Sequence, residues 1–296
     1  MSIHTCEVTM PEHGESRAVL VTGAAGGIGT ATIDTLAKRG YRVYAGVRAE
    51  SPHLEAMPGV QTLPLDVTSP EDIAAAAAEV TTRQHGHGLH AVINNAGVIV
   101  HGPLELVPPA ELHRQFDVNV HGPAEVTRAF LPMLRQGRGR VINVSAPTAR
   151  VAVPYNGPIG ASKAALESLS DAARVELAPW GIPVVIVIPG SVDTAIFTKA
   201  DAAARKALVD ADPDRVALYQ SRLEAVAAAM ANLKSSPPQT VADTIVRAVE
   251  AARPKARYVA NSDARLMMLV SRLPRRLRDR MLTRTLGLHK VASDAL

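Results

Sequence analysis

The chain alternates short, almost continuous apolar runs with longer stretches in which apolar residues recur at helical spacing. Apolar strands separated by helices are typical of a parallel sheet that is covered on both faces. We therefore predict an α/β fold with a doubly wound parallel sheet of about seven strands in a single domain. The runs predicted to be strands are 18–22, 41–47, 60–65, 89–94, 140–145, 184–188 and 256–260.

Two of the predicted helices have clear start signals. A glycine-rich stretch after the first strand opens a helix that we place from Gly29 to Arg39. Ser69 is a predicted N-cap, because Pro70 follows at the first helical position and two acidic residues complete the first turn.

The rest of the pattern divides the chain into parts. Residues 1–16 are polar and aperiodic and are expected to form a flexible arm, whereas 17–260 hold the sheet. Residues 191–237 form a long helical excursion, interpreted as a substrate lid or, alternatively, as a packing insertion. Residues 261–296 form a basic, amphipathic C-terminal extension.

Composition narrows the function classes. The 296-residue chain is 47% hydrophobic and 20% charged, which is ordinary for a globular protein. Cys6 is the only cysteine, so no intrachain disulfide can form. A net charge of +4 does not argue for nucleic acid. The N-terminus has no apolar, signal-like stretch, so we expect a cytoplasmic protein. We expect no metal site.

The segment TGAAGGIG (22–29) follows a strand and opens a helix. Small residues let a backbone approach a pyrophosphate closely, and a helix N-terminus supplies amide donors and positive potential. This context favours a nucleotide site over a simple tight turn. The predicted contacts in the turn are Gly23, Ala25, Gly27, Ile28 and Gly29.

The end of the second strand indicates which dinucleotide binds. Arg48 follows Val47 there, where an acidic residue would bind the ribose of NAD. A guanidinium suits a 2′-phosphate, so we expect NADP(H), unless Arg48 is only a solvated cation. Asp66 and Val67 are further predicted cofactor contacts, with Asp66 a candidate for the adenine amino group; the alternative for Asp66 is a turn cap.

These features, with four further motifs in order, resemble the short-chain dehydrogenase/reductase family over roughly residues 17–260. The motifs are NNAG (94–97), DVNVHG (117–122), ASKAAL (161–166) and IPGSVDT (188–194). The resemblance implies an NADP(H)-dependent oxidoreductase, with Lys163 and Asn119 in the catalytic set. It adds further cofactor contacts at Asn95, Ala96, Gly97, Lys163, Pro189, Gly190, Val192 and Thr194.

Two hydroxyls that the family uses are missing. The resemblance implies a tyrosine proton donor four residues before Lys163 and a serine thirteen residues before that tyrosine. Those positions hold Ile159 and Ala146, and Pro154 between them supports the register. The oxygen-binding half of the site is therefore absent while the cofactor half is kept.

Several groups are candidates for the missing acid. Tyr155 is the nearest hydroxyl in sequence, although a tyrosine packed on its loop is the favoured interpretation. Ser145 should face away from Ala146, because neighbouring strand residues point to opposite faces. Ser162 is expected to point away from the lysine, and His121 to lie at the surface or pack on a helix.

Other routes remain open. Asp193 and Thr194 lie near the expected nicotinamide, and buried Lys163 could itself act as an acid. A protonated imine or an activated alkene needs no hydroxyl at all. Three functions follow: a reductase of a small apolar substrate with an altered acid, a cofactor-binding regulatory protein, and a non-redox cyclase or isomerase.

The extension and the lysine helix bear on partners. Residues 257–282 resemble the family's subgroup that acts on steroids, retinoids or other lipophilic carbonyls. Five arginines between 272 and 280 surround apolar residues. Packing on the same subunit or a dimer mate is favoured over contact with an anionic membrane. The predicted helix 161–178 is apolar on several faces, and the resemblance implies a homodimer or homotetramer.

Overall fold

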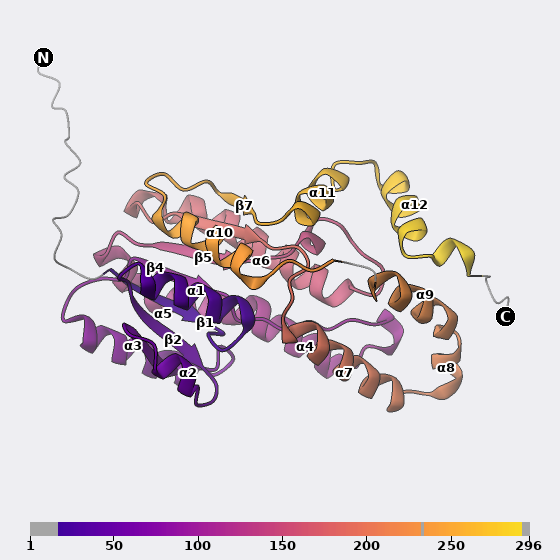
Figure 1. Ribbon diagram of the computed structural model, residues 1–296, viewed down its shortest axis with the longest axis horizontal. Helices are drawn as coiled ribbons and strands as arrows, with labels where there is room; N and C mark the ends of the chain where they lie inside the picture. Colours follow the sequence, from indigo (N-terminus) through magenta and orange to yellow (C-terminus); the bar gives the residue numbers. More distant parts are fainter. Residues whose placement is uncertain (1–16, 232–233, 292–296) are drawn as a thin grey trace, which may run out of the picture.

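The computed structural model describes residues 17–231 and 234–291, so the predicted arm 1–16 lies outside the described residues. Seven parallel strands form one sheet in the order β3-β2-β1-β4-β5-β6-β7 (Figure 1). The strands are β1 (Ala18–Thr22), β2 (Arg42–Val47), β3 (Val60–Pro64), β4 (Ala91–Asn94), β5 (Arg140–Val144), β6 (Val184–Ile188) and β7 (Arg257–Val259).

Helices cover both faces of this sheet. Buried residues of α1 and α10 build the core on one face, and those of α3 and α5 build it on the other. The α-helices are α1 (Gly27–Lys38), α2 (Pro52–Glu55), α3 (Pro70–Gln84), α4 (Pro109–Phe116), α5 (Gly122–Gln136), α6 (Gly157–Glu176), α7 (Ala195–Val209), α8 (Pro213–Ala217), α9 (Gln220–Ala231), α10 (Pro238–Glu250), α11 (Ser262–Val270) and α12 (Arg275–Thr285). A π-helical turn, η2 (Asp117–His121), joins α4 to α5. Short 3₁₀ turns are η1 (Leu104–Leu106), η3 (Pro147–Ala149), η4 (Ala178–Trp180) and η5 (Leu288–Lys290).

The doubly wound α/β prediction is confirmed, with every strand within two residues of its predicted start and end. Strand order runs outward in both directions from β1 and β4, and ligands of such sheets bind above that point, at the carboxyl ends. The Ser69 cap is also confirmed, since its Oγ accepts from the amide of Asp72 at 3.0 Å.

The lysine helix begins earlier than predicted. It starts at Gly157 rather than at residue 161, because Pro158 takes a first-turn position without needing its missing amide hydrogen. Ile159 consequently lies in the first turn of α6, one turn before Lys163. This register places both side chains on neighbouring parts of one helix face.

The excursion 191–237 leaves and returns at one point. Val192 and Ser236 form an isolated parallel bridge, and the amide of Asp193 donates to the oxygen of Ser236 at 2.9 Å. Between these residues lie α7, α8 and α9. Glu105 anchors the excursion to the loop after β4, because its carboxylate accepts from Arg215 at 2.8 Å and Tyr219 at 2.7 Å.

The C-terminal extension begins as part of the sheet's upper edge. Asn261 is buried directly after β7, and Ala264, Leu286 and Leu288 are buried further along. Figure 1 shows α11 and α12 at the end of the molecule that also carries α7, α8 and α9. Within the described ranges, no helix combines the length and apolar character needed to cross a bilayer.

Candidate active site

The glycine turn joins β1 to α1 and leaves no space for a side chain at Gly23 or Gly29. Gly23 has φ +63°, and a Cβ there would lie 2.7 Å from the Cα of Ala96. A Cβ on Gly29 would lie 2.4 Å from the oxygen of Gly23. Asn95 fastens the turn from β4, because its Nδ2 donates to the oxygens of Thr22 at 3.0 Å and Gly23 at 3.1 Å. Bare backbone is therefore presented at the helix N-terminus.

The opposite wall is the loop 189–194 after β6. A Cβ on Gly27 would lie only 2.7 Å from Cγ2 of Thr194, so this loop closes over the turn. The amide of Gly190 donates to Asn261 at 2.7 Å, and that of Ser191 donates to Asp263 at 2.6 Å.

Asn261 and Asp263 position the loop 189–194, and the sequence interpretation missed both. Both belong to the extension, which is thus continuous with the site. Two polar residues directly after the carboxyl end of a strand were the available signal.

The other end of the site holds Arg48 and Asp66. Arg48 is exposed just beyond β2, and Asp66 follows β3. Burial raises the pKa of Asp66, but hydrogen bonds from Thr68 and the charge of Arg48 outweigh it, so the pKa is lowered. Oδ1 of Asp66 accepts from the amide and hydroxyl of Thr68 at 2.9 and 2.7 Å. Asp66 therefore caps its own turn, as the alternative interpretation predicted.

Val67 lies beside this end of the site and packs beneath the start of α5. It is 7% exposed, and a Cβ on Gly122 would lie 2.9 Å from its Cγ2. The apolar contact fixes the loop that carries Asp66.

Lys163 is buried at the centre of the site, 8% exposed. Its Nζ donates to the backbone oxygen of Val144 at 2.7 Å, and burial lowers its pKa to about 8. A Cβ on Gly97 would lie 3.8 Å from this Nζ and 3.4 Å from Oδ1 of Asn119. The side chains of Lys163 and Asn119 therefore both point at Gly97, which has no side chain to fill the space between them.

Asn119 lies in the π-helical turn and holds the loop after β4. Its Oδ1 accepts from the amide of Val98 at 2.9 Å, and its Nδ2 donates to the oxygen of Val98 at 3.0 Å. Nδ2 also lies 3.4 Å from Oγ of Ser162. The Ser162 hydroxyl donates to the oxygen of Ile159 at 2.9 Å. It is thus part of the site's polar frame, whereas the sequence only predicted that it would point away from the lysine.

Gln115 completes this frame and was missed from sequence. It is fully buried; its Oε1 accepts from the amide of Val100 at 2.6 Å. Its Nε2 donates to the oxygen of Val98 at 2.9 Å and to Ser162 at 3.2 Å. Its spacing of four from Asn119, which puts both on one helix face, was the signal that could have revealed it.

Ala146 and Ile159 occupy the two sequence positions at which the family resemblance implies hydroxyls. Ile159 is 6% exposed, and Ala146 is half-buried at the start of η3. Ser145 does not replace them, because its Oγ donates to Glu167 at 2.9 Å. Glu167 in turn pairs with Arg150 at 2.8 Å. The strand alternation predicted this direction for Ser145.

Tyr155 lies beside a small apolar cavity. Tyr155 has a left-handed backbone conformation, with φ +65°, and its backbone carbonyl oxygen accepts from the amide of Gly102 at 2.7 Å. Tyr155 is the only residue in the lining whose side chain carries a hydroxyl. The cavity of about 260 Å³ is lined by Gly102, Leu104, Ala152, Val153, Pro154, Tyr155, Gly157 and Pro158.

Two other groups are engaged elsewhere. His121 is exposed and its Nδ1 lies 3.0 Å from Oδ1 of Asp117, as the surface interpretation predicted. Tyr219, between α8 and α9, donates to Glu105, and this hydrogen bond raises the pKa of Tyr219. Each of the two side chains thus already has a carboxylate partner.

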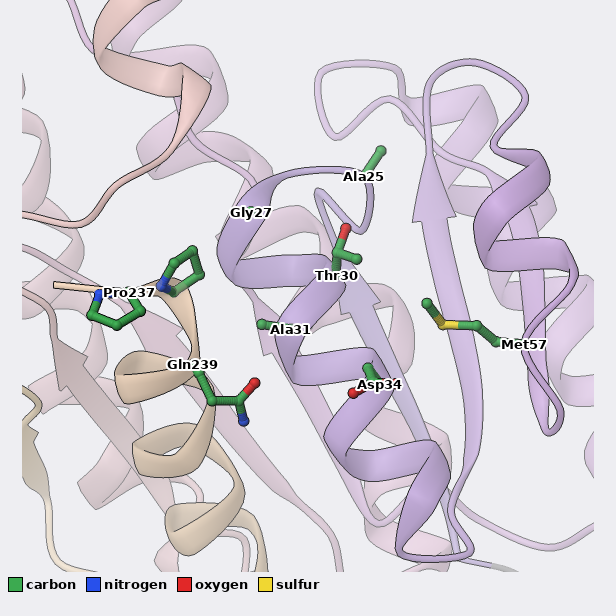
Figure 2. A pocket seen from close by; sticks show the side chains of 9 residues that line it. Ala25, Gly27, Thr30, Ala31, Asp34, Met57, Pro237 and Gln239 are labelled. Carbon is green, nitrogen blue, oxygen red and sulfur yellow. The ribbon is translucent and has the colours of Figure 1, made fainter.

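A larger groove of about 520 Å³ runs along the outer side of α1 (Figure 2). It touches the glycine turn only through Ala25 and Gly27, and Asp34 supplies its carboxylate. This carboxylate is paired with Lys38 at 2.7 Å. The groove is therefore the flank of the site and not its centre. The rest of its lining is Thr30, Ala31, Met57, Pro237, Pro238 and Gln239.

Comparison with known proteins fits this geometry. The profile of the short chain dehydrogenase family matches residues 17–205. The chain belongs to the short-chain dehydrogenase family. The resemblance read from the motifs is thereby confirmed, and the residues of the glycine turn, Asn119 and Lys163 occupy one site within that fold.

Individual relatives differ in how much they share. Estradiol 17-beta-dehydrogenase 2 of Mus musculus is 40% identical over 195 residues, covering 63% of this chain and 51% of that protein. The chain thus matches about half the length of that relative. A 3-amino-tetrahydro-pyrrolizinone reductase of Xenorhabdus hominickii is 30% identical, covering 84% of this chain and 88% of that protein.

Among solved structures, a short chain dehydrogenase from Burkholderia cenocepacia J2315 in complex with NADP superposes with a TM-score of 0.71. Its sequence is 27% identical, and the match covers 90% of this chain and 98% of that one. The shared fold therefore extends well past the region matched by the family profile.

Proposed function

We propose that this short-chain dehydrogenase is an NADP(H)-dependent reductase of a lipophilic small molecule whose reducible bond is a protonated imine. An activated alkene is the second substrate class. The observation that carries the proposal is the contrast at α6, where Lys163 is retained and Ile159 replaces the proton donor one turn earlier. Reduction of an ordinary ketone would lack its acid, which typically contributes about 10²–10⁴-fold.

The residues present fit a dinucleotide. The glycine turn offers bare backbone, and Gly97 leaves an open position between Lys163 and Asn119. Arg48 is exposed and ready for a 2′-phosphate. The Burkholderia relative was solved with NADP, which supports the same cofactor here. When bound, the nicotinamide would supply a hydride to the substrate carbon.

The chain's own residues would hold the cofactor and shield the reacting carbon from water. The Lys163 ammonium would hydrogen-bond the nicotinamide ribose, and the loop 189–194 would orient the carboxamide through Thr194. Ile159 and Ala146 would exclude water from the reacting carbon. In a protonated imine the π-electron pair moves to nitrogen as hydride adds, giving a neutral amine with no proton to deliver.

The substrate class draws support from the cavity and the relatives. The cavity lining beside Tyr155 is almost wholly apolar. Estradiol, in one relative's name, is lipophilic, and pyrrolizinone, in another's, contains nitrogen. Tyr155 remains the proposed donor for substrates that do require a proton.

The exposed surface of α6 supports a homo-oligomer. Val175 is 66% exposed, Leu169 48%, and Trp180, just beyond the helix, 52%. The Trp180 ring lies 4.8 Å from the guanidinium of Arg135 on α5, which joins the two helices into one face. Light scattering should show a dimer or tetramer that Val175→Glu disrupts.

The test of the function compares the wild type with Ile159→Tyr/Ala146→Ser. We expect both to bind NADPH more tightly than NADH, the wild type to reduce cyclic imines, and the double variant to gain ketone reduction. NADPH binding without turnover of any imine, alkene or ketone would favour a regulatory protein. Product formed without cofactor consumption would favour a cyclase or isomerase.

A further inference from the structure

The C-terminal helices each carry an exposed apolar pair, and the two pairs together are called the apolar stripe. On α11 Leu266 is 63% and Leu269 60% exposed, and on α12 Leu277 is 46% and Met281 39% exposed. The spacings of three and four put each pair on one face of its helix. Large apolar side chains gathered in one place at the surface usually mark a binding surface.

The stripe lies in a segment with a large excess of positive charge. Residues 262–291 hold seven arginines and one lysine against two aspartates. The rest of the chain holds 24 basic and 26 acidic residues, so the positive surplus resides in this segment. In the described part of the chain, no carboxylate forms a salt bridge with these arginines. Asp263 is already engaged by the amide of Ser191.

The segment is anchored at the mouth of the active site. Ala264 of α11 is buried, and so are Leu286 and Leu288, which follow α12, so the segment packs on its own subunit before and after α12. Nη1 of Arg278 donates to the oxygen of Arg150, on the loop that follows Ala146, at 3.4 Å. A Cβ on Gly287 would lie 3.9 Å from Ala225 of α9, so the lid is the other neighbour.

We propose that the outer face of α11 and α12 docks on an anionic lipid bilayer. Leucine and methionine enter the acyl boundary while the arginines bind headgroup phosphates. A second copy of the chain is a poor occupant, because two such faces would bring like charges together. Nucleic acid would use the arginines but would leave the apolar stripe in water.

This docking brings the excursion 191–237 and the loop after Ala146, which contact the segment from the protein side, near the bilayer, where the lipophilic substrate proposed above would be concentrated. The inference rests on surface charge and exposure and does not depend on the proposed imine chemistry.

The test is co-sedimentation of the full-length protein with phosphatidylcholine vesicles, with and without phosphatidylglycerol. We expect binding only to the anionic vesicles and release at high salt. Arg275→Gln/Arg276→Gln/Arg280→Gln should weaken partitioning about a hundred-fold, since each cation near such a surface contributes about five-fold. Leu277→Gln/Met281→Gln should weaken it as well.

The matched control is Arg42→Gln/Arg253→Gln/Lys255→Gln. It removes the same charge from exposed residues at the amino ends of β2 and β7, whereas α11 follows the carboxyl end of β7, and it should bind like the wild type. Equal loss in this control would overturn the proposal, and so would failure of the wild type to bind anionic vesicles. If Leu277→Gln/Met281→Gln binds the vesicles as well as the wild type, the face binds polyanions through charge alone and does not insert into the bilayer. If the wild type is a dimer and Leu277→Gln/Met281→Gln dissociates it in the absence of vesicles, the face is a subunit interface and the proposal is overturned.

Discussion

The ammonium group of Lys163 donates to the backbone oxygen of Val144, 2.7 Å away, two residues before the alanine that replaces the expected serine. The cation is thus held against the end of β5 and away from water. Burial is the cause of its lowered pKa of about 8. The site keeps a cation that can lose its proton near neutral pH beside an isoleucine that has none to give.

The pH dependence of stability should report this lysine. The native state binds its proton less tightly than the unfolded chain, so the free energy of unfolding rises between pH 8 and 10.5. The rise is of the order of 3 kcal/mol. Lys163→Met should abolish it in urea unfolding, and Lys255→Met, at an exposed position, should not. A difference between wild type and Lys163→Met that stays constant across this window would contradict the expectation.

Replacing Gln115 should loosen the loop after β4. Gln115→Leu leaves the amide of Val100 without its acceptor and the oxygen of Val98 with one donor fewer. Unsatisfied buried groups of this kind predict a loss of about 2–4 kcal/mol in the free energy of unfolding. Gln136→Leu, at an exposed position on α5, is the control and should stay within about 0.5 kcal/mol. Equal stability of the two variants in urea would show that Gln115 does not carry the loop.

Arg48 should decide between the two nicotinamide dinucleotides. Arg48→Gln removes a charge-assisted bond to a 2′-phosphate, which predicts roughly 10–100-fold weaker NADPH binding. NADH binding should hardly change, because NADH lacks that phosphate. Fluorescence titration with both nucleotides gives the ratio. Parallel losses for the two would mean that Arg48 only shapes the loop.

The glycine turn should tolerate no methyl group at Gly29. Gly29→Ala puts a Cβ 2.4 Å from a backbone oxygen, so the turn must move, at a cost of about 1–3 kcal/mol. Gly157→Ala, at the start of α6, meets nothing within 4 Å and should be neutral or slightly stabilising. Thermal unfolding of both variants checks the contrast. A melting temperature for Gly29→Ala as high as that of Gly157→Ala would refute the packing argument.

The sheet could be predicted because its signals are local. Each strand is a continuous apolar run, and the Ser69 cap and the glycine turn are short motifs whose side chains act on their own neighbourhood. The predicted strands therefore lie close to the observed ones. The start of α6 was placed four residues late, at the recognisable motif beginning with Ala161, whereas the helix begins at Gly157 and tolerates Pro158 in its first turn.

The polar frame around Lys163 could be predicted only in part. Asn119 and Lys163 belong to recognisable motifs, but Gln115 acts through the backbone of a loop fifteen or more positions away along the chain. Asn261 and Asp263 hold a loop about seventy residues earlier. Such partners depend on which strands end side by side, and that is a property of the assembled sheet. The burial of Leu286 and Leu288 beside exposed Leu277 is likewise invisible in a helical pattern.

The parallel bridge between Val192 and Ser236 has a consequence for how related sequences can diverge. Because the excursion departs and rejoins at one hydrogen-bonded point, everything between the two residues can be lengthened, shortened or exchanged without shifting β6 or α10. Recombination at that point would combine one cofactor-binding sheet with many different inserted segments. Substrate range in proteins of this architecture can therefore change through an exchangeable cassette, while the cofactor-binding half is inherited intact.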